Sequence, residues 1–510
     1  MKMVKSLLLG SAAGLAAMTG AQAADLPVKA KAVEYVKVCA AYGAGYYYVP
    51  GTDTCLRVGG YVRFDTYINA VGTFNPAISS AGATIFNGPG GGLGGYPFTT
   101  NDSSDYLTRA RAVVDLDART ATDYGVLRSY ARFGVQWDSS ASAGSPAGNS
   151  AYFERAFIQF AGFTFGYTQS FFDTGINYML TTPYAGSNTW TSAIAYTAQF
   201  GNGFSATIAL EDAANRTTGV QQTAALGTFT NTTTLAGFTG LAYTNYQEGQ
   251  QAPDIVANLR LDQAWGTAML SGALHQVGGV TPLNAGGGPF LGAQGSDTWG
   301  WAVGGSVEFK LPMLSPGDSL YIQANYADGA LNYLGLSGTA QGRATGLGSI
   351  DLNSNLNTGD GAFYPLADAI WNGTGYSKES GWAIQGQYRH YWVPNLRSAL
   401  YGGYAKVEVP GNAIFTPAQI SFAGAGSGLA AFNGGYNVEI WQVGLNTIWS
   451  PVKNLDLGLE VLYSKVDGSL PLTAASVSSS ATAPTATTSA AVFGGSSDVW
   501  SGGFRAQRNF

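Results

Sequence analysis

The chain has 510 residues, of which 71 are glycine and only 11% are charged, whereas a typical soluble domain has about 25% charged residues. Aromatic residues make up 13% of the chain and the formal net charge is −6. The aromatic content excludes a disordered chain, and the excess of acidic residues argues against a nucleic-acid-binding protein. Beyond the first two dozen residues no run of 18 apolar residues occurs, which excludes a bundle of membrane-spanning helices.

The N-terminus has the pattern of a secretory signal peptide. Lys2 and Lys5 precede an apolar stretch over 7–18, and the tripeptide at 21–23 has the small-x-small form of a cleavage site. A membrane anchor is the alternative, but the apolar stretch is short for a spanning helix. We therefore predict that residues 1–23 form a signal peptide and that the mature chain is exported.

Two cysteines follow the predicted cleavage site. Cys39 and Cys55 have 15 residues between them, and an exported protein meets oxidising conditions. We expect a disulfide, worth about 3 kcal/mol in the chain-entropy model, whose loop belongs to a periplasmic N-terminal segment spanning 24–54. The alternative, a redox or metal role, lacks a CxxC motif, and the two histidines, His275 and His390, are far apart in sequence. No metal and no cofactor are expected.

Strict period-two alternation dominates the rest of the chain. In the segment 56–69, Val58 and Val62 lie on an apolar face, whereas Arg57 and Arg63 lie on the opposite, polar face. Sixteen segments with this pattern are predicted strands: 56–69, 105–119, 124–138, 152–161, 162–170, 191–200, 203–212, 254–264, 266–277, 299–311, 319–328, 380–392, 396–409, 436–449, 454–467 and 497–510.

The connections between these segments alternate in length. The odd-numbered connections run from 13 residues (139–151) to 51 residues (329–379), whereas every even-numbered one has seven residues or fewer. Tight turns at one end and long loops at the other are typical of a transmembrane β-barrel. We predict an all-β, 16-stranded antiparallel barrel over 55–510, with short periplasmic turns and long external loops. A soluble β-sandwich or a β-solenoid is the alternative.

Arginines gather on the polar faces of four consecutive predicted strands. Strand direction places them at comparable depth, so they are expected to form a basic wall in the lumen. The alternative is that they pair with Asp65, Asp115, Asp117 and Glu154. The predicted members of the wall are Arg63, Arg109, Arg111, Arg132 and Arg155.

The third long connection, 171–190, is compact and partly apolar. This composition suits a loop folded into the barrel, where Asp173 would face the arginines across a constriction and create a transverse field. An ordinary external loop fits the same residues. No Ser/His/Asp set or HExxH motif accompanies the two histidines, so the chain is not expected to be an enzyme. His390, on one strand face with Trp382 and Trp392, fits an interfacial position.

Several stretches closely resemble alphaproteobacterial porins of the rhizobial and Brucella type. They are EYVKVC at 34–39, YGAGYYYVPGTDTCLRVGGYVR at 42–63 and RAFIQFAGFTFG at 155–166, and the terminal Phe510 also fits. The resemblance implies a 16-stranded, trimeric general-diffusion porin with an infolded third loop. It also implies that Phe510 belongs to the signal read by the outer-membrane assembly machinery.

The combined expectation is a multi-pass porin of the bacterial outer membrane that passes ions and small hydrophilic solutes by passive diffusion. Its expected partners are outer-membrane lipid and lipopolysaccharide, two further copies of the chain and the assembly machinery, with no nucleic acid. One alternative is a substrate-selective channel for a sugar or an anion. The other is a surface adhesin or receptor that acts through its long loops.

Overall fold

The structure is a computed structural model. It describes residues 37–68, 70–71, 75–76, 106–139, 148–181, 185–222, 229–231, 248–279, 297–336, 366–371, 375–410, 418–422, 428–432, 436–469, 472–474 and 495–510. The predicted signal peptide, 1–23, lies outside these residues. Within the described ranges, no helix is both long enough and apolar enough to cross a membrane.

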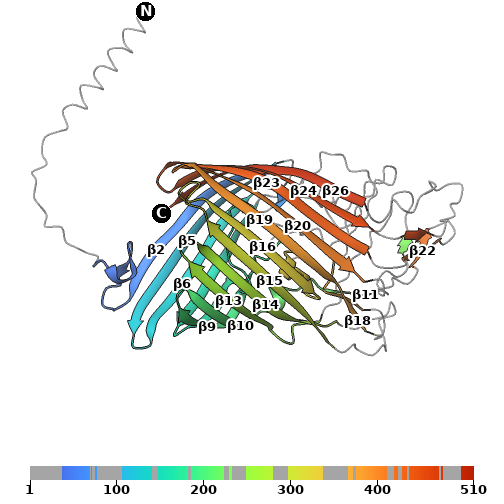
Figure 1. The fold of residues 1–510 in the computed structure, drawn as a ribbon, viewed down its shortest axis with the longest axis horizontal. Coiled ribbons are helices and arrows are strands. Elements are labelled where there is room, and N and C mark those ends of the chain that lie inside the picture. The colour runs from blue at the N-terminus through green and yellow to red at the C-terminus, as the bar shows by residue number, and fades with distance from the viewer. Residues whose placement is uncertain are drawn as a thin grey trace, which may run out of the picture.

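Sixteen antiparallel strands close into a barrel, as predicted (Figure 1). Each strand pairs with its neighbours in chain order, and β2 closes the ring by pairing with both β5 and β26. The strands are β2 (Cys55–Ile68), β5 (Tyr106–Thr122), β6 (Gly125–Asp138), β7 (Gly148–Phe160), β8 (Phe163–Gln169), β9 (Trp190–Gly201), β10 (Phe204–Glu211), β13 (Asp254–Gln263), β14 (Gly266–Val277), β15 (Thr298–Lys310), β16 (Ser319–Asp328), β19 (Ser380–Val393), β20 (Leu396–Val409), β23 (Tyr436–Val452), β24 (Leu455–Ser469) and β26 (Gly495–Asn509).

Short elements accompany the barrel. A two-residue strand β1 extends its sheet by pairing with β2, and three small sheets are formed by β3 with β4, by β11, β17 and β18, and by β12, β21, β22 and β25. Their bounds, with those of the 3-10 helices, are η1 (Ala40–Tyr42), β1 (Tyr47–Tyr48), β3 (Ala70–Val71), β4 (Asn75–Pro76), η2 (Ala213–Asn215), β11 (Val220–Gln222), β12 (Phe229–Asn231), η4 (Leu331–Leu334), β17 (Ala369–Trp371), β18 (Tyr376–Lys378), β21 (Ala418–Phe422), β22 (Gly428–Phe432) and β25 (Leu472–Ala474).

The two faces of each strand differ as the alternation predicts. Outward side chains such as Val62, Ile208 and Leu459 are apolar and more than half exposed, whereas Asp65 and Gln387 point inward and are buried. Exposed apolar side chains around the whole circumference are stable only against lipid. The barrel therefore presents an apolar outer surface and a polar lumen.

Exposed aromatic side chains form two belts near the strand ends. Tyr and Trp favour this depth because one end of the ring system is apolar and the other is wet. His390, expected at such a belt, contacts Trp392 and also makes a 2.7 Å contact from Nδ1 to Asp318 Oδ2. The long-loop belt includes Tyr106, Trp137, Trp299, Trp301, Tyr326, Trp382 and Trp500, and the short-turn belt includes Tyr124, Phe200, Phe204, Trp265, Phe309, Trp392 and Trp449.

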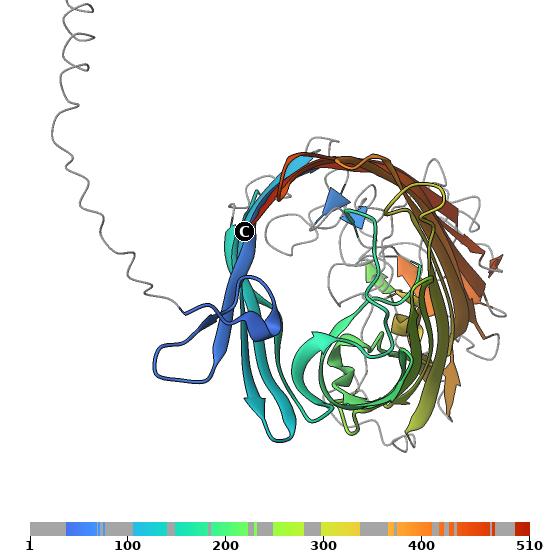
Figure 2. The same cartoon turned by 60° about the vertical axis from the view of Figure 1, so that its left-hand side comes forward.

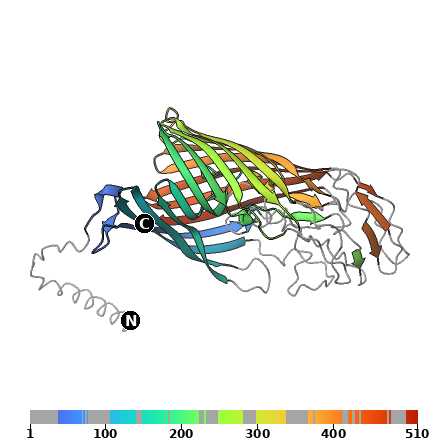
Figure 3. The ribbon, with the colours of Figure 1, turned by 90° about the horizontal axis from the view of Figure 1, so that it is seen from below.

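The two described chain ends lie at the short-turn end of the barrel (Figures 1 and 3). Phe510 exchanges two backbone hydrogen bonds with Gly60, with N···O distances of 3.1 and 3.2 Å. The Phe510 ring lies over Gly60, where an added Cβ would be 2.7 Å from Phe510 Cζ. Glycine is thus needed at 60 for close approach of the last residue.

The predicted disulfide is confirmed. Cys39 and Cys55 are bonded, with a Cα–Cα distance of 6.0 Å, and both are buried with Tyr46 in a small cluster. Arg57 and Arg119 lie over the Tyr46 ring, which joins this cluster to the barrel mouth. Residues 37–54 are therefore fixed to the short-turn end of the barrel.

Candidate functional site: the barrel lumen

The third loop, of which the structure describes residues 170–181 and 185–189, runs inside the barrel over these residues (Figure 2). It leaves β8, and its backbone hydrogen-bonds with side chains of β13, β19, β23 and β24 before it joins β9. Because β19, β23 and β24 lie on the other side of the barrel from β8, the loop can reach them only across the lumen. The prediction of an infolded third loop is confirmed.

The tip of the third loop is held by side chains of the far wall. Glu460 accepts hydrogen bonds from the amides of Leu180 and Thr181 at 2.8 and 3.0 Å. Tyr178 donates its amide to Gln387 at 2.6 Å and its hydroxyl to Glu308 at 2.5 Å. Burial, together with the bond to the Glu308 carboxylate, raises the pKa of the Tyr178 hydroxyl, which stays protonated as a donor.

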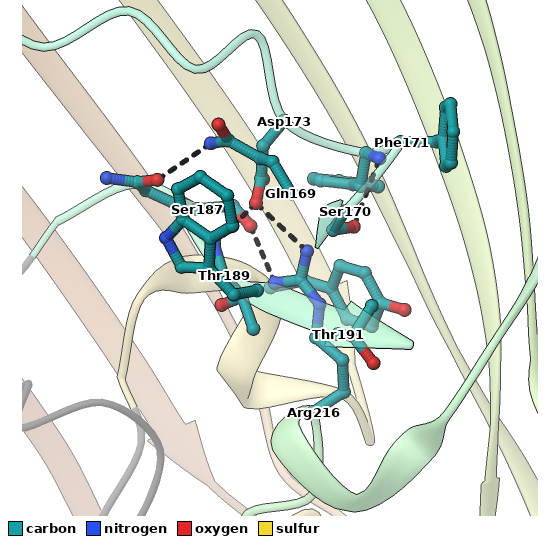
Figure 4. Close-up of polar contacts among 12 residues, drawn as sticks. Gln169, Ser170, Phe171, Asp173, Ser187, Thr189, Thr191 and Arg216 are labelled. Atoms are coloured by element: carbon teal, nitrogen blue, oxygen red, sulfur yellow. Dashed lines mark hydrogen bonds and ion pairs between the residues drawn. The ribbon is translucent and has the colours of Figure 1, made fainter. Parts of the chain in front are cut away.

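Asp173 does not face the arginine wall, contrary to the prediction. Its side chain is 1% exposed, and its Oδ2 accepts from Arg216 Nη2 at 3.2 Å and from the Thr189 amide at 2.6 Å (Figure 4). A cation from the next long connection neutralises it, and no periodic pattern in the sequence marks that partner. Asp173 therefore holds the third loop in place, and its carboxylate does not face the arginines across the lumen.

The structure brings the predicted arginines together on adjacent strands. Arg63 lies directly opposite Arg111 across β2 and β5, and Arg132 lies opposite Arg155 across β6 and β7. The register shifts between Arg132 and Phe133, which leaves Glu154 as an extra residue on β7. This β-bulge lets Glu154 and Arg155, neighbours in sequence, both lie on the lumenal side.

Most of these arginines also have carboxylate partners. Arg63 and Arg505 share Asp65 at 3.1 and 2.7 Å, and Arg132 Nε lies 2.7 Å from Glu154. Like charges placed opposite each other are destabilising, and the interposed acids offset that repulsion.

The remaining members have other partners. Arg109 pairs with Asp138, and Arg111 lies 3.8 Å from Glu154 and donates to Gln136. Arg155 has no carboxylate within 4.0 Å among the described residues, and its guanidinium lies 4.2 Å from the Trp190 ring centroid. Positive charge on this wall is thus only partly neutralised.

The lumenal charge of this side can be counted from the strand register. The inward faces of β2, β5, β6, β7 and β26 hold nine arginines and five carboxylates, a net of +4. The arginines are Arg57, Arg63, Arg109, Arg111, Arg119, Arg128, Arg132, Arg155 and Arg505, and the acids are Asp65, Asp115, Asp117, Asp138 and Glu154.

Water reaches this charged side more than the far side. Arg57, Arg132 and Glu154 have side chains 41%, 25% and 22% exposed. Asp254 and Glu211, on the inward faces of the strands beyond the third loop, are fully buried. Water therefore reaches part of the arginine side of the lumen, whereas Arg63, Arg109 and Arg111 are only 11%, 10% and 12% exposed.

A second group of infolded segments occupies the far side, which the sequence reading missed. Helix η4 and the residues 366–370, both from the sixth long connection, pack with Phe172 of the third loop in one buried core. The barrel strands contribute small inward residues to this core, among them Ala195, Ala209, Ala273, Ala302, Ala327, Ala383 and Ala405. Inward alanines on seven strands are the signal that could have indicated it, because they leave room for chain inside the barrel.

The described residues contain no group of three or more His, Cys, Asp or Glu side chains arranged to hold a metal ion. Phe510 lies beside Gly60 as the last residue of the closing strand, exposed at the barrel end.

A family model described as "Porin subfamily" matches residues 25–494. Porin Omp2b of Brucella suis biovar 1 (strain 1330) and porin Omp2b of Brucella melitensis biotype 1 are each 33% identical over 275 residues. Each alignment covers 52% of this chain and 64% of the relative, so the match spans less than two thirds of those porins.

Among solved structures, the outer membrane channel DcaP of Acinetobacter baumannii superposes with a TM-score of 0.53 at 17% identity, covering 91% of this chain and 99% of that one. At that identity the likeness shows the barrel fold alone. With the family match over nearly the whole chain, it places the protein in the outer membrane as a multi-pass barrel. The chain belongs to the porin subfamily.

Proposed function

We propose that the protein is a passive diffusion channel whose constriction lies between the third loop and the arginine wall. The observation that carries this proposal is the third loop crossing the lumen and seated on the far strands through Glu460 and Gln387. A loop so placed narrows the barrel without closing it, and it leaves the solute path along Arg63, Arg111 and Arg132. The channel is proposed to have no catalytic activity.

The charge of the arginine wall supports a preference for anions. Net positive charge in a narrow aqueous passage raises the local concentration of anions and lowers that of cations. The members proposed to act at the constriction are Arg63, Arg109, Arg111, Arg132 and Arg155. Small hydrophilic solutes with no charge are expected to pass according to size.

Planar-bilayer conductance with a KCl gradient tests this function. The purified protein should give discrete steps whose reversal potential has the sign of chloride selectivity. A protein that inserts and gives no steps would overturn the proposal. Block of the steps by one sugar or one organic anion, saturating with its concentration, would instead support a substrate-selective channel.

The partners are proposed from the family and from the barrel surface. We propose outer-membrane lipid as the partner of the exposed apolar outer surface, with lipopolysaccharide in the outer leaflet, and a homotrimer as the assembled form. We also propose that Phe510 is read by the assembly machinery. Deleting Phe510 should reduce the folded protein in outer-membrane fractions without reducing its synthesis, and cross-linking in membranes should give a trimer band.

A further inference from the structure

We propose that Arg216, from the fourth long connection, is the residue that positions the root of the third loop and thereby sets the width of the constriction. This inference rests on the proposed channel function. Arg216 is 0% exposed although it lies inside a water-containing barrel, and it belongs to no barrel strand.

Arg216 contacts both legs of the third loop. Its Nη2 lies 3.2 Å from Asp173 Oδ2 on the leg that leaves β8, and its Nη1 donates to Ser187 Oγ at 2.7 Å on the leg that returns to β9 (Figure 4). Asp173 in turn accepts from the Thr189 amide. One guanidinium therefore ties together two parts of the loop that are 14 residues apart in sequence.

The same guanidinium joins the third loop to the sixth long connection. It lies 4.1 Å from the ring centroid of Tyr333 in η4, and that ring packs edge-on against Phe172 with centroids 4.7 Å apart. Tyr333 donates its hydroxyl to Asp254 of β13 at 2.7 Å, which fixes the group to the barrel wall. We call Phe172, Asp173, Ser187, Arg216 and Tyr333 the Arg216 cluster.

The cluster and the tip contacts hold different parts of the loop. Leu180 and Thr181 are bound to Glu460 on β24, whereas the cluster holds residues 172–173 and 187–189 near β9. Between them lie Gly175 and Asn177, the two exposed residues among those of the loop that the structure describes. A buried ion pair is stable only when both of its charges are present. Removing the guanidinium of Arg216 therefore leaves the charge of Asp173 buried without its cationic partner. We expect residues 172–173 and 187–189 of the loop then to move so that water can solvate the Asp173 carboxylate.

The test is single-channel recording of Arg216→Met, with Arg216→Lys and the double variant Asp173→Asn/Arg216→Met. Arg216→Met should show frequent transitions to a larger conductance state and faster passage of large neutral sugars relative to small ones in liposomes. Arg216→Lys should restore part of the parent behaviour because it keeps the charge. The double variant should be less perturbed than Arg216→Met because no buried charge is left unpaired.

Arg260→Met is the matched control, since Arg260 pairs with Asp262 on β13 at 2.8 Å, is one-third exposed and makes no hydrogen bond or ion pair with the described residues of the third loop. It should conduct like the parent. The heat stability of the folded barrel on gels separates local loop displacement from general unfolding. If Arg216→Met stays folded and keeps the parent conductance and sugar discrimination, the inference is wrong. If the parent itself gives no conductance, the proposed function fails instead.

Discussion

Replacing Arg109, Arg111 and Arg132 together by glutamine should shift the channel towards cations. The substitutions lower the net charge on the inward faces of β2, β5, β6, β7 and β26 from +4 to +1 and leave Asp138 and Glu154 without their guanidinium partners. The loss of positive charge and the unpaired carboxylates both favour cations over anions. The quantity to compare is the ratio of chloride to potassium permeability.

The size of the effect follows from Coulomb's law. A charge about 8 Å from a permeating ion contributes roughly 0.5 kcal/mol in water, and screening at 0.1 M salt about halves it. Three such charges give roughly 0.7 kcal/mol, which favours chloride and opposes potassium by the same amount. The permeability ratio should therefore fall by about tenfold, since about 1.4 kcal/mol corresponds to that factor.

The assay is the reversal potential across a planar bilayer with a tenfold KCl gradient, where perfect selectivity corresponds to about 59 mV. A matched control replaces three cations at the short-turn end, Lys310, Lys453 and Arg508, by glutamine and should change the potential much less. A folded triple variant of the wall with the parent reversal potential would refute the reasoning.

Three further predictions concern stability. The double substitution Cys39→Ser/Cys55→Ser should speed hydrogen exchange in residues 37–54 while conductance is kept, and parent-like exchange would contradict the role of the disulfide in fixing this segment. Gly60→Ala should lower the temperature at which the folded barrel is lost on gels, because its Cβ would meet the Val113 carbonyl and the Phe510 ring; an unchanged temperature would show that the closing strand can shift. Asp318→Asn should destabilise the barrel at neutral pH, and the difference from the parent should disappear in acid.

The pH dependence at Asp318 has a definite sign. Burial opposes ionisation, but bonds from His390, the Tyr391 amide and Tyr388 outweigh it and hold the pKa of Asp318 below its ordinary value of 3.8. A lowered folded-state pKa gives stability that is present above 3.8 and is lost as the pH falls through the folded value. Melting temperatures of the parent and of Asp318→Asn, measured from neutral to acidic pH, test this loss of stability. A difference in melting temperature that stays constant down to strong acid would contradict it.

The strands could be predicted because lipid on one side and water on the other impose a period of two on the sequence. Strands such as β16 and β20 match their predicted ranges, and the arginines were placed correctly on facing positions. The alternation is weaker over β9, β10 and β14, where the inward alanines Ala195, Ala209 and Ala273 replace polar residues because chain, not water, covers them. The prediction for Asp173 failed because its partner, Arg216, comes from a connection whose path no periodicity specifies.

The pairing of β2 with β26 has a consequence for how the protein is made. Asp65 and Arg505 are 440 residues apart in sequence, yet they form an ion pair across the seam. One edge of β2 therefore keeps its backbone groups unpaired until β26 has been synthesised and has reached the membrane. Contacts this distant form slowly, and an open strand edge invites pairing with other chains. Any chain cut short before its final strand would keep that edge, so completing the sequence is itself a condition for a barrel that lipid can accept.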